Sequence, residues 1–535
     1  MRGAAILRAE KQGDAPKTRQ THQTINDAGE QGQLTAEEKG HGVEPEQAHT
    51  APVQRADDHQ DQRKFVNDHK KPPFHTGSAI ACPRAVKVCA AKRQMRIASA
   101  AFWMYNKKIR QQNATIYEGA DPMKYILIIG DGMADNPVEA LGGKTPLQVS
   151  DIPTIRRFAA KGTVGHTINC PKPLPAGSET AILSIFGCDP REWFTGRSPM
   201  EAAASGIQLT PGDVAYRCNI ITLEDADCAY EDKKILSHSA GSIDGESAFR
   251  VVEILESDPE FRAAQEKARM VIHRAPAFRQ LAIQSGAEVK GIKLIPPHDH
   301  LGEKQGEYLP SGCENAAVLD ELMRIAHRVL NGHPFNDERR AAGKMPANGI
   351  WFWAEGTAVT LPDFKAQYGH TGGVISAVPL CHGIGALRGL QMIEVEGATG
   401  EIDTNFEGKL QAALDLLHTD AGFCCLHLEA PDECTHNGDL EGKIQSINWL
   451  DSRILKPLFE VLDGEGMEYR VLLLSDHKTL TSTRGHDGDP VPFLLYDSRT
   501  DTGFGGLYDE ETGMAGPFVE RGCDLLSILF EQKSL

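Results

Sequence analysis

Three apolar runs of the sequence each end in side chains that can bind a divalent cation. The run Ile-Leu-Ile-Ile-Gly leads into an aspartate, the run Cys-Leu-His-Leu-Glu-Ala-Pro leads into an aspartate and a histidine, and Val-Leu-Leu-Leu-Ser leads into adjacent aspartate and histidine residues. A further histidine lies in the loop Thr-Arg-Gly-His-Asp-Gly-Asp. The full set of candidate ligands is Asp131, Asp432, His436, Asp476, His477 and His486. Three carboxylates and three imidazoles suit one or two ions of the manganese, zinc or magnesium type, not a thiolate site.

A serine that could act as a nucleophile lies in Pro-Ala-Gly-Ser-Glu-Thr-Ala-Ile-Leu-Ser. The glycine-containing turn and the apolar pattern after it predict that Ser178 begins a helix, where backbone N–H groups favour a phosphate. A serine hydroxyl is a weak nucleophile unless a base or a metal ion favours its ionised form. Taken alone, a serine in this context is commonly only a helix N-cap. Its coincidence with the Asp/His set favours phosphoryl transfer at a metal site.

These side chains need a scaffold that brings distant strand ends together, and the pattern after Met123 predicts one. Short apolar runs alternate with longer amphipathic stretches, which is typical of an α/β fold with a mostly parallel sheet covered by helices on both faces. The clearest helix follows Asp439, with apolar residues three and four apart. In such sheets ligands lie at the carboxyl ends of strands. The expected strands are residues 125–129, 373–378, 392–395, 423–428, 471–474 and 491–496.

The domain organisation is predicted from changes of texture along the 535 residues. Residues 1–122 are polar and lack apolar periodicity, so we expect a disordered leader, or a true start at Met123; a regulatory or targeting tail is the alternative. Residues 123–193 and 365–535 are expected to form one metal-binding domain. Residues 194–364, richer in charge and containing Pro296-Pro297, are expected to form an inserted, substrate-binding α/β domain.

Composition excludes several classes of function. A formal net charge of −18 argues against a nucleic-acid partner, which needs a positive surface. No apolar run approaches the roughly 18 residues of a membrane span. The 12 cysteines show no paired spacing and are expected to be reduced thiols, which points to the cytoplasm. An anionic substrate must therefore meet locally concentrated positive charge, such as bound metal ions.

Beyond these local signals, the chain after Met123 resembles cofactor-independent phosphoglycerate mutases of the alkaline phosphatase superfamily, in their archaeal-type branch. The motifs that carry the resemblance run in order along nearly the whole region. They are Gly-Asp-Gly-Met at 130–133, Lys-Thr-Pro-Leu at 144–147, Ala-Gly-Ser-Glu-Thr-Ala at 176–181, Phe-Thr-Gly-Arg-Ser-Pro-Met-Glu-Ala at 194–202, Gly-Asp-Val-Ala-Tyr-Arg-Cys-Asn at 212–219, Glu-Gly-Ala-Thr-Gly at 396–400, Glu-Ala-Pro-Asp-Glu-Cys-Thr-His at 429–436 and Asp-Pro-Val-Pro-Phe at 489–493.

The resemblance implies an isomerase that interconverts 2- and 3-phosphoglycerate through a phosphoserine at Ser178, without 2,3-bisphosphoglycerate. It implies two divalent ions, with Mn²⁺ favoured over Mg²⁺, Zn²⁺ or Co²⁺. One would be held by Asp432, His436 and His486, and the other by Asp131, Asp476, His477 and Ser178. The implied partner is a small phosphorylated carboxylic acid, and the implied state is a monomer. Candidate substrate-binding residues are Arg217, Arg279, His238, Ser239, His298, Asp299 and His382.

The sequence departs from the family pattern on the substrate side. Relatives tend to have a lysine where this chain has His382, a shorter and often neutral group, and Lys478-Thr479-Leu480 replaces a proline-bearing turn. Three alternatives therefore remain open: a homoserine kinase-like phosphotransferase, a metal-dependent phosphatase, and a non-catalytic binding protein. The first two would use the same serine and ions, so assays must separate them from a mutase.

Overall fold

The structure is a computed structural model, and it describes residues 123–501 and 506–535. The predicted leader, residues 1–122, lies outside the described residues. Within them, no helix is both long enough and apolar enough to cross a membrane.

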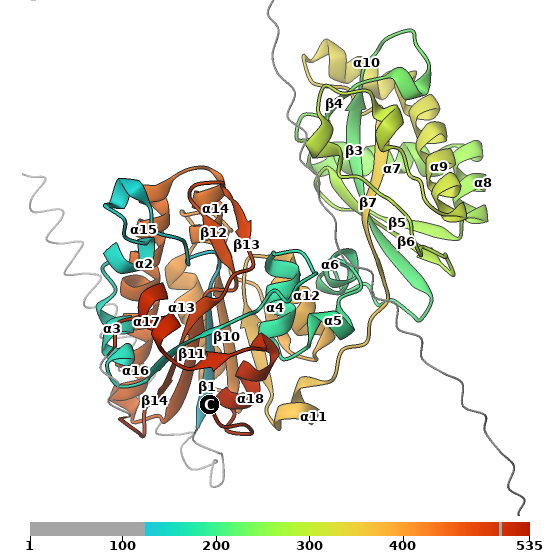
Figure 1. The fold of residues 1–535 in the computed structure, drawn as a ribbon. Coiled ribbons are helices and arrows are strands. Elements are labelled where there is room, and N and C mark those ends of the chain that lie inside the picture. The colour runs from blue at the N-terminus through green and yellow to red at the C-terminus, as the bar shows by residue number, and fades with distance from the viewer. Residues whose placement is uncertain (1–122, 502–505) are drawn as a thin grey trace, which may run out of the picture. The chain divides into compact units, whose positions relative to one another are not determined.

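An eight-stranded sheet forms the larger part of the described chain, and the predicted α/β fold with a mostly parallel sheet is confirmed (Figure 1). Two neighbouring pairs in this sheet, the ones on either side of β14, are antiparallel, whereas the other five pairs are parallel. In spatial order the strands are β15 (Phe518–Val519), β2 (Thr163–Thr167), β14 (Val491–Asp497), β11 (Tyr469–Leu474), β1 (Lys124–Gly130), β10 (Phe423–Leu428), β8 (Gly372–Ile375) and β9 (Gln391–Ile393). The sequence pattern did not predict the short strands β2 and β15.

Both faces of this sheet are covered, because apolar residues of its central strand alternate between two cores. Ile126 and Ile128 of β1 pack with one helical layer, and Leu127 and Ile129 pack with the other. Burying each such side chain contributes roughly 1.5–3 kcal/mol. The first layer contains α3 (Pro153–Ala159), α13 (Phe406–Leu417), α15 (Leu440–Trp449) and α16 (Lys456–Glu465); the second contains α4 (Ser178–Ile185), α11 (Phe364–Tyr368), α12 (Pro379–Leu387) and α18 (Leu525–Leu529) (Figure 1).

A second, antiparallel sheet lies within the segment 194–364. Strand β3 is buried along its whole length and pairs with both β6 and β7. The hydrophobic core beside this sheet is formed by buried residues between Val214 and Trp353. The strands are β3 (Asp213–Leu223), β4 (Ile235–Ser237), β5 (Met270–His273), β6 (Arg279–Ser285) and β7 (Gly349–Thr357); the helices packed on them are α7 (Gly245–Ser257), α8 (Pro259–Lys267), α9 (Glu314–Asn331) and α10 (Pro334–Ala341).

The short helix α6 (Ser198–Ala204) contacts elements of both sheets. It packs against α12, and the Ser198 hydroxyl donates a hydrogen bond to the carbonyl of Ala354 in β7. Glu201 on the same helix bonds Arg217 of β3. Helix α6 therefore contacts elements of both groups.

Candidate metal and nucleophile site

The carboxyl ends of three adjacent parallel strands bring the predicted ligands to one edge of the sheet. Asp131 follows β1, Asp432 lies in α14 (Ala430–His436) just after β10, and Asp476 follows β11. Strand β1 lies between β10 and β11, with Ile128 opposite Leu426 on one side and Leu473 on the other. The three strands therefore end together, and their first polar residues meet.

A small antiparallel pair of strands returns His486 to the same edge. Thr479 of β12 (Lys478–Leu480) lies opposite His486 of β13 (Gly485–Asp487). The His486 Nε2 atom is 2.9 Å from His436 Nε2 and 3.5 Å from an Asp432 oxygen, and His436 Nε2 is 3.1 Å from the other Asp432 oxygen. Asp432, His436 and His486 thus offer ligand atoms close enough to share one ion.

The environment of His436 prepares one of its nitrogens for a cation. Its Nδ1 donates to the Arg484 carbonyl at 2.9 Å, which keeps a proton on Nδ1 and directs Nε2 at the cluster. In the absence of a cation, the hydrogen bond to Asp432 raises the pKa of His436 to about 9. A metal ion must therefore displace a proton to bind there.

Ser178 lies beside the second set of ligands. Its Oγ is 3.1 Å from His477 Nε2 and 3.4 Å from Asp131 Oδ2. His477 Nε2 is in turn 3.2 Å from Asp476 Oδ2 and 3.6 Å from Asp131 Oδ1. Asp432 also comes within ligand-sharing range of Asp131 and His477, so it borders both sets. The structure thus brings together the serine and the six predicted ligands.

Two buried oxygen atoms test whether this set fits divalent cations. Asp131 Oδ1 and Asp476 Oδ2 have no hydrogen-bond partner among the described residues, whereas Asp476 Oδ1 accepts bonds from the backbone N–H groups of Gly132 and His477. Burial, followed by the charges of Asp476, Asp432 and Glu429, raises the pKa of Asp131 well above its usual value. Buried, unpaired carboxylate oxygens beside imidazoles fit divalent cations, which offset this repulsion.

Local backbone geometry explains why these loops can approach so closely. Helix α4 begins at Ser178, so the hydroxyl lies where free N–H groups point outward. Gly132 has φ of 59°, and a Cβ there would lie 2.4 Å from Thr479 Oγ1 and 2.6 Å from an Asp432 oxygen. A glycine is required at this position both for its backbone conformation and for space.

Four of the predicted substrate-binding residues gather around a tryptophan of the second sheet, Trp353. Its ring lies 4.6 Å from the Arg217 guanidinium carbon, 5.7 Å from that of Arg279 and 5.0 Å from the His298 ring. The His238 ring is 5.8 Å from the His298 ring. Burial and the charge of Arg217 lower the pKa of Arg279 to about 10, so it stays cationic at neutral pH. Arg279 Nε has no hydrogen-bond partner in the described part of the chain.

The other predicted substrate-binding residues lie differently. Ser239 Oγ accepts a hydrogen bond from the backbone of Ser242 in a turn, and Asp299 is exposed, 3.8 Å from His298 Nε2. His382 lies in α12 and lines a cavity of about 310 Å³ together with Ser376. Burial lowers the pKa of His382, and its Nε2 has no hydrogen-bond partner within residues 123–501 and 506–535. None of these three contacts Ser178.

Several residues near the site were not predicted from the sequence. Arg197 lies 3.6 Å from Glu179, the neighbour of Ser178, and donates a 3.1 Å hydrogen bond to Glu201. Glu201 also accepts two hydrogen bonds from Arg217. Arg197 and Glu201 belong to the motif at 194–202, which carries the family resemblance but has no sequence signal for these contacts. The Asn169 amide holds the backbone beyond β11 by donating to the carbonyl of Asp476 at 2.7 Å.

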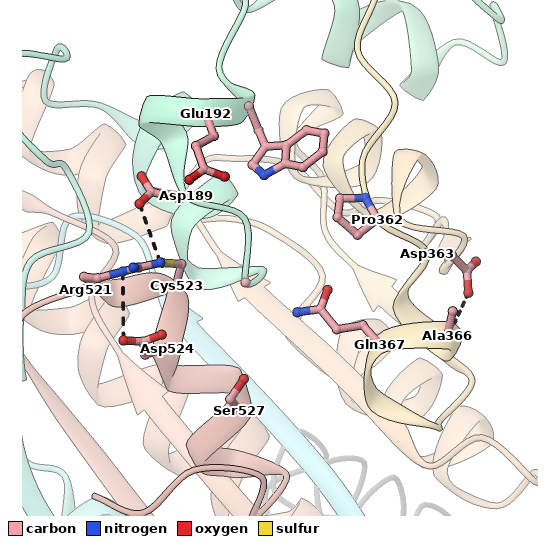
Figure 2. A pocket seen from close by; sticks show the side chains of 12 residues that line it. Asp189, Glu192, Pro362, Asp363, Ala366, Gln367, Arg521, Cys523, Asp524 and Ser527 are labelled. Atoms are coloured by element: carbon pink, nitrogen blue, oxygen red, sulfur yellow. Dashed lines mark hydrogen bonds and ion pairs between the residues drawn. The ribbon is translucent and has the colours of Figure 1, made fainter. Parts of the chain in front are cut away.

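A separate cavity of about 530 Å³ contains none of the predicted site residues (Figure 2). It lies between α5 (Pro190–Trp193), α11 and α18. Arg521 bridges Asp189 and Asp524 along one wall, and Asp363 caps α11 on the other. Its acidic groups are exposed or already paired, so the cavity is not the site of the chemistry described above.

Comparison with known proteins points to one family. A family model described as 2,3-bisphosphoglycerate-independent phosphoglycerate mutase matches residues 159–336. The chain is 40% identical over 414 residues to the enzyme of that name from Methanosarcina barkeri, covering 77% of this chain and 100% of the relative. The Methanosarcina acetivorans enzyme is 40% identical over 412 residues, with 76% and 99% covered.

Solved structures agree on the fold. A protein from Pyrococcus horikoshii is 28% identical with a TM-score of 0.63, covering 77% of this chain and 98% of that one. The cofactor-independent phosphoglycerate mutase from Thermoplasma acidophilum is 22% identical with a TM-score of 0.53, covering 77% and 99%. At this identity the second likeness shows the fold alone.

Proposed function

The chain belongs to the 2,3-bisphosphoglycerate-independent phosphoglycerate mutase family, and from this we infer that it interconverts 2- and 3-phosphoglycerate through a phosphoserine at Ser178. The observation that supports this role is the position of Ser178 Oγ, 3.1 Å from His477 Nε2 and 3.4 Å from Asp131 Oδ2. A hydroxyl at a helix N-terminus, beside two clusters of metal-binding side chains, is placed to accept a phosphoryl group.

We assign Asp432, His436 and His486 to one divalent ion, and Asp131, Asp476, His477 and Ser178 to the other. Bound there, the two ions would favour the ionised form of the Ser178 hydroxyl and offset the charge of the phosphoryl group. We propose Mn²⁺ as the ion, because oxygen and imidazole ligands suit it, and a monomer as the working unit.

The phosphoryl group is transferred in two steps, both of which involve Ser178. Ser178 Oγ forms a bond to phosphorus while the ester bond to one glycerate hydroxyl breaks, and the phosphoserine later returns the group to the other hydroxyl. The second transfer reverses the first at a different glycerate oxygen, so no water, oxidant or second phosphate donor is consumed. Phosphoryl transfer of this kind depends mainly on positioning and charge, because little covalent chemistry is left to the protein.

Retention of glycerate between the two transfers requires cationic groups that hold its carboxylate. We propose Arg217 and Arg279 for this role, since both guanidinium groups lie against Trp353 and Arg279 keeps an unpartnered Nε. In the absence of substrate, Glu201 occupies the fork of Arg217 with its own carboxylate. An arriving carboxylate would compete for the same hydrogen bonds.

A paired assay tests the proposal against its alternatives. The protein is supplied with Mn²⁺ and either 3-phosphoglycerate, with 2-phosphoglycerate measured through enolase, or homoserine and ATP, with phosphohomoserine measured. We expect turnover in the first tube only. Turnover restricted to the second tube identifies a homoserine kinase-like enzyme, and release of inorganic phosphate faster than isomerisation identifies a phosphatase. A chelator should abolish the activity and added Mn²⁺ should restore it.

A further inference from the structure

His427 connects the ligand Asp131 to a strand that carries no metal ligand. It is completely buried near the carboxyl end of β10, opposite Ile129 of β1. Its Nε2 is 3.0 Å from Asp131 Oδ2 after β1, and its Nδ1 is 3.0 Å from the Ser376 hydroxyl after β8. One imidazole thus spans both strands that flank its own.

The surroundings of the ring determine which nitrogen carries the proton. Ser376 Oγ already accepts a hydrogen bond from the backbone N–H of Val378 at 3.0 Å, and its own proton is free to be donated to His427 Nδ1. The proton of the neutral ring then lies on Nε2 and is donated to Asp131 Oδ2. The opposite tautomer would direct the Nε2 lone pair at a carboxylate oxygen, which is repulsive.

The hydrogen bond from His427 places the two oxygens of Asp131 in different surroundings. Oδ2 is held by His427, whereas the buried Oδ1 has no hydrogen-bond partner among the residues that the structure describes. Asp476 shows the same division, with Oδ1 held by the backbone N–H groups of Gly132 and His477 and Oδ2 unpartnered. Each carboxylate therefore keeps one oxygen without a hydrogen bond, and these two oxygens lie 3.6 Å and 3.2 Å from His477 Nε2, which itself is 3.1 Å from Ser178 Oγ.

Building on the proposed function, we propose that His427, oriented by Ser376, is a positioning residue that holds Asp131 Oδ2 and leaves Oδ1 as the ligand oxygen of the ion beside Ser178. The residue does not touch substrate. It acts on the affinity of one of the two ions, because outer hydrogen-bond partners fix the orientation of a ligating carboxylate. Among the described residues, the hydrogen-bond partners of the His427 ring are Ser376 and Asp131, so it does not hold the cluster of Asp432, His436 and His486.

Three substitutions separate hydrogen bonding from packing. His427→Gln keeps an N–H donor close to the position of Nε2 and so retains the bond to Asp131. His427→Asn keeps an amide close to the position of Nδ1, where it reaches Ser376 but not Asp131. His427→Phe fills the volume without any donor. A purely structural role would make the glutamine and asparagine variants behave alike.

The readout is Mn²⁺ binding to the chelator-treated full chain, measured by isothermal titration calorimetry. We expect two ions for the unmodified protein. His427→Asn and His427→Phe should weaken one of them by about 10- to 100-fold and leave the other unchanged, whereas His427→Gln should stay within a few-fold of the unmodified chain. Unmodified affinity in the asparagine or phenylalanine variant overturns the proposal, as does a glutamine variant as weak as asparagine.

Two further variants guard against loss of folding. His327→Phe makes the same change at a buried histidine of α9 in the second sheet's core, and it should bind both ions normally. If the His427 variants do not fold, Ser376→Ala tests the same hydrogen-bond chain and should weaken the same ion; full affinity there overturns the proposal. A chain that binds two ions but does not isomerise phosphoglycerate refutes the proposed function while leaving this result to be decided by the binding data.

Discussion

Replacing Lys443 should show how strongly the return loop that carries His486 depends on one buried ion pair. The Lys443 ammonium is fully buried, 3.0 Å from Asp135 Oδ2, and it also donates to the Thr479 carbonyl at 2.7 Å. Asp135 accepts further hydrogen bonds from the backbone N–H and the hydroxyl of Thr481. The pair therefore holds Thr479 of β12, and Thr481 just after it, against the loop that follows β1.

The expected loss of unfolding free energy follows from the groups that Lys443→Met leaves without a partner. Methionine fills a similar volume, but Asp135, only 2% exposed, loses its counter-charge and the Thr479 carbonyl loses its donor. Breaking a buried pair from one side costs about 3–5 kcal/mol. The hydrogen bonds that Asp135 keeps from Thr481 place the expected loss of unfolding free energy at the lower end of that range. The double variant Lys443→Met/Asp135→Asn should lose clearly less than the sum of the two single variants.

Urea unfolding of the chelator-treated protein, followed by circular dichroism, measures this change without interference from metal binding. The two sheets have separate cores, so the shift is expected in the transition that belongs to the eight-stranded sheet. Lys533→Met is a matched control, because its ion pair with Asp524 is half exposed and should contribute below about 1 kcal/mol. A loss under about 1 kcal/mol for Lys443→Met, or additive single variants, would refute the reasoning.

Three further predictions concern the site itself. Ser178→Ala should keep the circular dichroism of the parent chain but form no phosphoenzyme and show no turnover; appreciable isomerisation would remove the serine from its assigned role. Arg279→Ala should raise KM for phosphoglycerate by about 10- to 100-fold, the loss of a hydrogen bond to a charged group, and an unchanged KM would contradict that contact. Because the hydrogen bond to Asp432 raises the pKa of His436 to about 9, and a ligand must lose its proton to bind, the apparent Mn²⁺ affinity of that cluster should fall by about tenfold per pH unit as pH decreases below 9. Calorimetry showing the same affinity at pH 6 and pH 8 would contradict it.

The sequence was sufficient to predict that the candidate ligands lie together, because the rule that relates them is simple. Polar residues that directly follow apolar strands of a parallel sheet must meet at one edge, whichever order the strands take. Asp131, Asp432 and Asp476 therefore needed no knowledge of strand order. His486 was expected to fold back from a loop, and the pairing of β12 with β13 supplies the geometry.

The supporting residues could not be predicted, because their roles depend on register and on contacts distant in sequence. His427 lies inside the apolar run Cys-Cys-Leu-His-Leu, where a histidine has no visible signal. Its function emerges only when Ile129 is placed opposite it and Ser376 arrives from a third strand, 51 residues away. The pairing of Glu201 with Arg217 likewise depends on where α6 lies against β3. Local patterns carry no information on such pairs.

The charge around Ser178 explains how a chain with a net charge of −18 can be suited to a phosphorylated acid. Among the described residues, the basic side chains within ion-pairing distance of Asp131, Asp432 and Asp476 are all histidines, not lysine or arginine. Burial lowers the pKa of His477, and it lowers that of His427 to about 3, so these two rings are neutral at physiological pH. Beside Ser178, a phosphate dianion would therefore meet buried carboxylates whose charge neither ring neutralises. Bound divalent ions would make the local charge positive, so phosphate binding is expected to depend on metal binding. The positive charge would then lie at the point where the phosphoryl group is transferred.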